Sequence, residues 1–109
     1  MRIILLLSFF TLFSYANMGE ILYQGNCHTC HGYDKANSAP SAKAIQQRYK
    51  EVFEEKEAFI DFMREWIKLP KEESALMPDE IRKHGLMPVL GYDDFTLNEV
   101  GNYLFETEF

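Results

Sequence analysis

The most regular alternation of apolar and polar residues runs from residue 54 to residue 68. Its apolar positions recur at intervals of three and four, which places their side chains on one face of an α-helix. They are Phe59, Phe62, Met63, Trp66 and Ile67. Pro70 forces Leu69 out of the helical region and so ends the segment. We therefore predict an amphipathic helix over 54–68.

Two shorter helical patterns precede this segment. Residues 19–26 combine apolar and polar positions as a short amphipathic helix does. Ser41 is placed to cap a second helix that continues through Tyr49, because its hydroxyl can accept a hydrogen bond from a free N–H group of the first turn. Between the two helices, residues 27–40 are rich in Gly, Asp, Asn, Ser and Pro, a composition that predicts a loop.

The C-terminal third predicts two more helices. After a charged link at 71–73, Pro78 can open a short helix at its first position, where a missing N–H group breaks no helical hydrogen bond. Gly85 is placed to end that helix. Thr96 and Glu99 form a capping box that predicts the start of the last helix. The sequence contains no convincing pair of strands, so we predict an all-α fold.

The first residues differ in character from the rest of the chain. Arg2 precedes an apolar run over 3–13, and residues 14–16 have the small-bulky-small pattern that signal peptidases prefer. The run is shorter than the roughly 20 apolar residues that span a bilayer. We interpret residues 1–16 as a cleaved signal peptide and 17–109 as one exported, periplasmic domain. Membrane association is expected only if the segment stays uncleaved.

Composition and charge narrow the choice of partner. The 109 residues include 11 Lys and Arg against 17 Asp and Glu, a formal net charge of −6. Without a basic patch to neutralise phosphates, we expect no nucleic-acid partner. Most carboxylates are interpreted as a solvated face that could steer a basic partner. They are Glu51, Glu54, Glu55, Glu57, Glu72, Glu73, Asp79 and Glu80.

The candidate chemistry lies in the run Cys-His-Thr-Cys-His, which contains both cysteines of the chain. This C-x-x-C-H pattern is the attachment signature of a c-type haem. Two residues between Cys27 and Cys30 let one turn of chain present both sulfurs to the two vinyl groups of the haem. The adjacent His31 then offers a nitrogen to the iron. We therefore predict one covalent haem c, which would also act as the staple that a domain of this size often needs.

Three other chemistries use cysteines at this spacing. A thioredoxin-like redox pair requires a βαβ setting and a cysteine at a helix start, but the sequence predicts no strands. A structural zinc ion usually takes four Cys or His ligands, and only His28 and His84 remain as further candidates. A plain disulfide across two residues would be strained and would leave His31 without a role. The haem interpretation is therefore favoured.

The run from Cys27 to Gly32 resembles the haem site of the class I cytochromes c, and the resemblance extends over essentially all of 17–109. It implies four to five helices packed around one covalently attached haem. In that family a proline carbonyl, here that of Pro40, accepts a hydrogen bond from the second ring nitrogen of the haem-binding histidine. Such a bond orients the ring and raises its basicity.

The resemblance also implies a crossing between the first and last helices. The family uses a glycine and an aromatic residue on the first helix and an aromatic residue on the last. Gly19, Tyr23 and Tyr103 occupy the matching positions in this sequence. The missing side chain of Gly19 would allow the two backbones to approach closely.

The family further implies a methionine axial ligand opposite His31, on a loop before the last helix. Two Met-Pro pairs compete, at Met77 and at Met87. Met87 is favoured because an extended loop separates it from the last helix, whereas Met77 directly precedes a predicted helix start. His84 is a third candidate, although its place at a helix C-terminus is more typical of an exposed residue. We predict His31 and Met87 as the axial ligands of the haem iron.

Three further side chains are expected to have other roles. Met63 lies on the apolar face of a helix and is expected in the core, and His28 is expected to be solvated. Trp66 has two interpretations. It packs in the core, or it donates its indole N–H to a haem propionate as in some relatives of the family.

Axial ligation by His31 and Met87 would leave no open position on the iron, so the residues indicate an electron carrier rather than an enzyme. The expected partners are redox proteins: a respiratory complex, an oxidase or a periplasmic oxidoreductase. Two alternatives remain open. One is a haem c electron-transfer subunit of a periplasmic oxidoreductase complex, and the other is a haem-based ligand sensor in which Met87 is weakly bound or displaced.

Overall fold

The computed structural model describes residues 18–109. This part of the chain consists of helices and loops without a strand, which confirms the prediction of an all-α fold. None of the helices in this part is long and apolar enough to cross a membrane. The predicted signal peptide, residues 1–16, lies outside the described residues.

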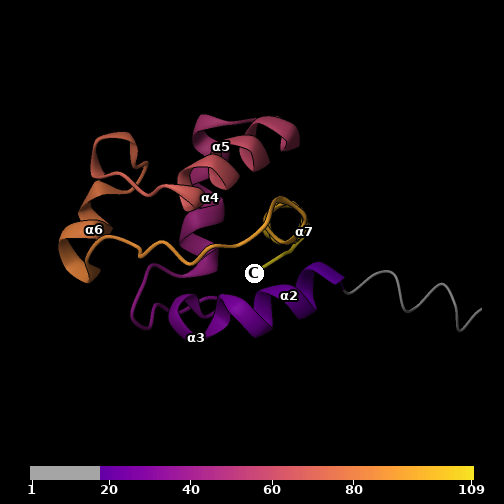
Figure 1. Ribbon diagram of the computed structural model, residues 1–109, viewed down its shortest axis with the longest axis horizontal. Coiled ribbons are helices and arrows are strands. Elements are labelled where there is room, and N and C mark those ends of the chain that lie inside the picture. Colours follow the sequence, from indigo (N-terminus) through magenta and orange to yellow (C-terminus); the bar gives the residue numbers. More distant parts are fainter. Residues whose placement is uncertain (1–17) are drawn as a thin grey trace, which may run out of the picture.

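Six α-helices and one short 3-10 helix follow one another along residues 18–109 (Figure 1). They are α2 (Met18–Asn26), α3 (His28–His31), α4 (Ala42–Val52), α5 (Lys56–Lys68), η1 (Glu72–Ser74), α6 (Pro78–His84) and α7 (Asp94–Glu106). The count exceeds the four to five helices implied by the resemblance. One reason is that the chain leaves helical geometry at Cys27, which separates the four-residue α3 from α2.

Most helix ends follow the local signals in the sequence. The Ser41 hydroxyl accepts a hydrogen bond from the Ala44 N–H group at 3.1 Å and caps α4 as predicted. Pro78 opens α6, and Gly85 ends it with φ 91°, a conformation that favours glycine. α5 ends at Lys68, as the proline two residues later predicts.

Two local predictions were wrong. Asp93, not Thr96, caps α7: the Asp93 carboxylate accepts a hydrogen bond from the Thr96 N–H group at 2.8 Å. Both residue types can cap a helix, and the earlier cap adds residues to the start of α7. Residues 28–31 form a short helix instead of a loop, because the glycine and asparagine that favour a loop lie after them. The charged link also contains η1, which the sequence did not predict.

Helix α7 lies at the centre of the fold, with α5 on one side and α2 on the other (Figure 1). The buried side chains that meet there are aromatic and aliphatic. They are Tyr23, Ala42, Tyr49, Phe59, Met63, Val100 and Leu104. A Cβ atom at Gly101 would lie 2.7 Å from Met63 Cε, so this glycine allows α5 to pack closely on α7.

The crossing of α2 and α7 depends on a second glycine. A Cβ atom at Gly19 would lie 2.6 Å from the Glu99 carbonyl oxygen and 2.8 Å from Tyr103 Cβ. The rings of Tyr23 and Tyr103 pack beside this point with their centroids 5.3 Å apart. These contacts confirm the helix crossing that Gly19, Tyr23 and Tyr103 were expected to make.

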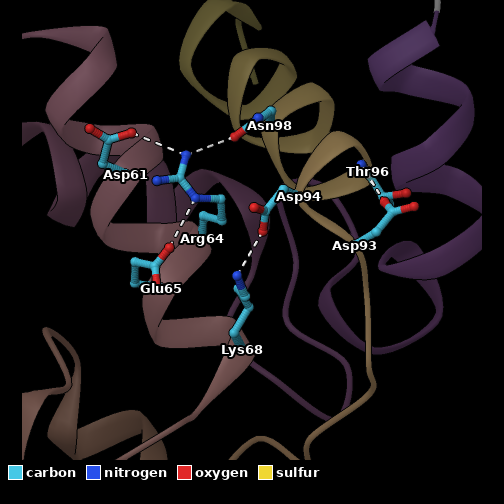
Figure 2. A network of polar contacts seen from close by, with 8 residues as sticks. All are labelled: Asp61, Arg64, Glu65, Lys68, Asp93, Asp94, Thr96 and Asn98. Atoms are coloured by element: carbon cyan, nitrogen blue, oxygen red, sulfur yellow. Dashed lines mark hydrogen bonds and ion pairs between the residues drawn. The ribbon is translucent and has the colours of Figure 1, made fainter.

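Polar contacts between α5 and α7 fix their relative position on the exposed side (Figure 2). Arg64 donates a hydrogen bond to the Asn98 side-chain oxygen at 3.0 Å, and it also pairs with Asp61 on its own helix. The Lys68 amino group lies 2.8 Å from an Asp94 carboxylate oxygen. Exposed ion pairs contribute little to stability, so the buried core supplies most of the attachment between these helices.

Candidate functional site

The C-x-x-C-H segment forms a compact turn at the end of α2. The Cys27 N–H group donates to the Tyr23 carbonyl oxygen at 2.8 Å, and the His31 N–H group donates to the Cys27 carbonyl oxygen at 3.0 Å. Gly32 then ends α3 with φ 60°, a left-handed conformation that favours glycine. The Tyr23 hydroxyl donates to the Gly32 carbonyl oxygen. These bonds hold both cysteines and the histidine on one short stretch of backbone.

The imidazole of His31 is held by one hydrogen bond. Its Nδ1 atom lies 2.8 Å from the Pro40 carbonyl oxygen, so Nδ1 carries the proton and donates it. This confirms the contact that the resemblance implied. Burial lowers the pKa of His31; the Pro40 bond opposes this, and the charge of His84 adds to it. The ring is therefore oriented with Nε2 free to bind a metal.

A cavity of about 350 Å³ opens beside this segment. Cys27, Cys30 and His31 all line it, together with side chains from α4, α5, α6, α7 and the chain on either side of α6. Most of the lining residues are aliphatic or aromatic. A cavity of this size with an apolar lining and a few polar groups is typical of a cofactor site.

All the candidates for the second axial ligand line this same cavity. Met87 does so and is half-buried, but Met77 and His84 line it as well. The structure therefore brings Cys27, Cys30, His31 and Met87 to the lining of one cavity. Its geometry does not separate Met87 from the two alternatives.

Two predictions about α6 were wrong. The side chain of His84 was expected to be exposed, but only 12% of its surface is accessible. Glu80 was assigned to a solvated face, but it also lines the cavity, with one carboxylate oxygen 3.2 Å from His84 Nε2. Glu80 and His84 are four residues apart, so they lie on the same face of α6. That face borders the cavity.

Trp66 lies at the cavity, not fully in the core, and its indole N–H already has a partner within the chain. Its ring lines the cavity and is half-buried. Its indole N–H donates to the Lys71 carbonyl oxygen at 3.0 Å, which satisfies the one donor of the side chain. This bond also ties the end of α5 to the loop that follows it. Met63 is in the core as expected, with 2% of its surface exposed, and His28 is exposed as expected.

Cys27 lacks the lowered pKa that a redox-active thiol needs. Burial, together with the smaller effect of the neighbouring Cys30, raises the pKa of the Cys27 thiol to about 11. A reactive thiol pair needs the opposite shift, because the thiolate is the nucleophile. Within residues 18–109, no group of three or more His, Cys, Asp or Glu side chains is arranged to hold a metal ion, so the zinc alternative gains no support there.

Tyr92 is a cavity residue that the sequence analysis did not identify. Its hydroxyl donates to the Asn26 carbonyl oxygen at 3.0 Å, which joins the chain before α7 to the end of α2. Gly91, directly before it, has φ 74°. A glycine followed by an aromatic residue in a loop was the available signal, but it does not identify the partner.

Comparison with known proteins gives no match: no protein-family model matches the chain, and neither does any curated protein or solved structure. The functional interpretation therefore depends on the cavity itself. Its donor set consists of two free thiols, one oriented imidazole and a thioether in an apolar lining. These groups fit a covalently attached haem.

Proposed function

We propose that this protein is a single-electron carrier of the class I cytochrome c type, with one haem c attached through Cys27 and Cys30. His31 and Met87 are its axial ligands, and it acts in the periplasm after cleavage of residues 1–16. The observation that carries the proposal is the meeting of both thiols with an imidazole whose Nδ1 is bound to Pro40. The helix crossing at Gly19 supports the same fold.

The haem, when bound, supplies the one-electron chemistry by cycling between ferric and ferrous iron. The residues of the chain determine how that chemistry is used. His31 is held by Pro40 with Nε2 toward the cavity, and Met87 provides a thioether on the same cavity. If His31 and Met87 both held the iron, substrate would find no open position on it, and a thioether donor would favour the reduced state. The apolar lining, which includes Met63, acts in the same direction.

Electrons would enter and leave beside Cys30, because this residue is exposed whereas Cys27 is half-buried. The acidic surface favours a basic redox partner such as a respiratory complex or an oxidase. No side chain is required as an acid, base or nucleophile, so we propose a carrier rather than an enzyme.

One observation favours a second candidate, the electron-transfer subunit of a periplasmic oxidoreductase. Leu86 and Leu90 line the cavity, yet 47% and 50% of their surfaces are exposed, and the neighbouring Val89 is 64% exposed. An apolar rim of this kind is typical of a surface that a partner protein covers. Copurification of an enzyme with the protein from its native membrane-free extract would favour this candidate over a free carrier.

The decisive test is the covalent haem. The full chain is produced in a bacterium that contains the cytochrome c maturation machinery, and its mass is measured after denaturation. We expect the mass of the polypeptide without residues 1–16 plus one haem, and a pyridine adduct spectrum typical of two thioether bonds. The Cys27→Ser/Cys30→Ser variant is expected to lose the haem on denaturation. A chain that matures and is exported without haem contradicts the proposal.

A matched histidine pair tests the first axial ligand. His31→Gln removes the predicted ligand, whereas His28→Gln changes an exposed histidine in the same short segment. We expect the low-spin spectrum to be lost in the first variant and retained in the second. Equal effects would mean that His31 has no special role. A ferric absorption band from sulfur-to-iron charge transfer, lost in Met87→Ala, would identify the second ligand.

A further inference from the structure

His84 is not one of the two predicted axial ligands, yet one of its ring nitrogens is buried. Its Nε2 atom is buried and has no hydrogen-bond partner within residues 18–109. The Glu80 carboxylate oxygen lies 3.2 Å away, but the contact does not have hydrogen-bond geometry. A buried polar atom without a partner is unfavourable by about 1–3 kcal/mol. Such an atom in a native fold therefore suggests a ligand.

His84, which carries this nitrogen, lines the same cavity as His31. Both imidazoles line it, and they lie close enough for the charge of His84 to lower the pKa of His31. The nearest carboxylate, that of Glu80, disfavours an anionic ligand beside His84 and favours a cationic one. A metal cation in the cavity fits this environment better than a carboxylate or phosphate group.

The backbone between His84 and Met87 is loosely surrounded by the rest of the described chain. Gly85 has φ 91°, is exposed, and would have no atom within 4 Å of an added Cβ among the described residues. Leu86 is 47% exposed. An exchange of the His84 and Met87 side chains at the cavity would therefore not have to break close packing at Gly85 or Leu86.

We propose that His84 is an alternative axial ligand, which binds the iron on the face opposite His31 when the Met87 sulfur leaves it. This inference rests on the proposed haem function. In the exchange one iron–sulfur bond breaks and one iron–nitrogen bond forms through the lone pair of Nε2. The bond requires Nε2 without a proton, so the bound imidazole would hold its one proton on Nδ1, and the iron would keep its oxidation state. The site would thereby stay closed to external ligands, which disfavours the sensor alternative.

The test removes Met87 and then asks whether His84 fills its place. Three holoproteins are compared: Met87→Ala, Met87→Ala/His84→Gln, and the control Met87→Ala/His28→Gln, which changes an exposed histidine instead. Met87→Ala is expected to keep a low-spin ferric spectrum with two nitrogen axial ligands. In the reduced form it should bind carbon monoxide about 10-fold or more weakly than the His84 double variant, since His84 holds roughly nine-tenths of the sites. The His28 control should behave as Met87→Ala.

Several results would overturn the inference. If Met87→Ala and the His84 double variant bind carbon monoxide equally tightly, His84 does not reach the iron. A high-spin ferric spectrum of Met87→Ala would mean the same. This result needs only the single variant, so it holds even if the double variant fails to fold. If His84→Gln alone removes the sulfur-to-iron band, His84 supports the resting site and is not an alternative to Met87. Loss of covalent haem in the unmodified protein would instead contradict the proposed function itself.

Discussion

The helices α2, α5 and α7 differ from residues 71–93, which lie between α5 and α7, in how deeply their apolar side chains are buried. In the three helices, Phe59, Leu97 and Val100 have at most 2% of their surface exposed. By contrast, no residue from 71 to 93 is fully buried. This segment contains α6, which lies away from α7 at the left of Figure 1.

The difference follows from what each region packs against. The three helices pack against one another, and Gly19 and Gly101 let their backbones approach closely. The half-buried side chains of 71–93, such as Leu76, Ile81 and Met87, line the cavity instead. We therefore expect the order of residues 71–93 to depend on the proposed haem, whereas the three helices are ordered by packing against one another. Regions with few buried contacts open more readily than the core.

The largest expected effect separates the two regions directly. Cys27→Ser/Cys30→Ser prevents covalent attachment of haem, so the side chains that line the cavity lose the group against which we propose that they pack. We expect amide hydrogen exchange in residues 71–93 to become about 100-fold faster, a loss of roughly 3 kcal/mol of local stability. Exchange in the centres of α5 and α7 should change much less. Equal acceleration in both regions would mean that they fold as one unit and that the comparison is wrong.

A substitution of intermediate effect tests the close approach of α2 to α7. Gly19→Ala would place a methyl group 2.6 Å from the Glu99 carbonyl oxygen, so a helix must shift. We expect a loss of about 1–3 kcal/mol in the free energy of unfolding measured with urea. Gly25→Ala is the matched control in the same helix, because a Cβ there meets no described atom within 4 Å. It should stabilise the protein by up to about 1 kcal/mol. If both variants were destabilised equally, the close approach of α2 to α7 would not explain the effect of Gly19→Ala.

The smallest expected effect concerns the junction of the two regions, where Asp93 caps α7. The hydrogen bonds from Thr96 lower the pKa of Asp93 below its ordinary value of 3.8. A lowered carboxyl pKa contributes stability above pH 3.8, and this contribution is lost as the pH falls through the folded pKa. Asp93→Asn keeps a capping side chain but does not titrate, so its melting temperature should fall less than that of the unmodified protein between about pH 6 and about pH 3.

An exposed carboxylate provides the control for this last prediction. Asp34→Asn changes an exposed loop residue outside any helix, and its melting temperature should follow that of the unmodified protein across the same pH range. If the melting temperatures of Asp93→Asn and Asp34→Asn depended on pH in the same way, ionisation of Asp93 would not stabilise the fold. The Asp93 side chain would then contribute nothing to the start of α7.

Local signals predicted the helices well where one signal dominated. The apolar spacing before Pro70 predicted a helix over 54–68, and the structure has it at Lys56–Lys68. Ser41 was correctly identified as a cap. The start of α7 was misplaced because Asp93 and Thr96 are both capping residues and only three positions apart. Choosing between them requires the packing of the whole helix.

For the candidate site too, residues close together in the sequence were easier to predict than residues far apart. The grouping of Cys27, Cys30 and His31 was evident from their spacing, and one turn of chain is enough to bring them together. Pro40 was expected from the resemblance, and its contact with His31 is present. On α6, His84 was considered only as a third candidate ligand, and the place of Glu80 at the cavity was not foreseen. Glu80 and His84 share a face of the helix, but the sequence of a short, highly charged helix does not reveal which face is covered.

The amino-acid sequence by itself determined the chemistry of the C-x-x-C-H segment and the positions of most helices, because both depend on residues close together in the chain. The tertiary structure alone decided which distant side chains share the cavity. It brought Met77, His84 and Met87 to one cavity and buried Nε2 of His84 with no hydrogen-bond partner among residues 18–109. That outcome depends on how α6 is set against the core, and side chains far apart in the sequence fix this placement through packing.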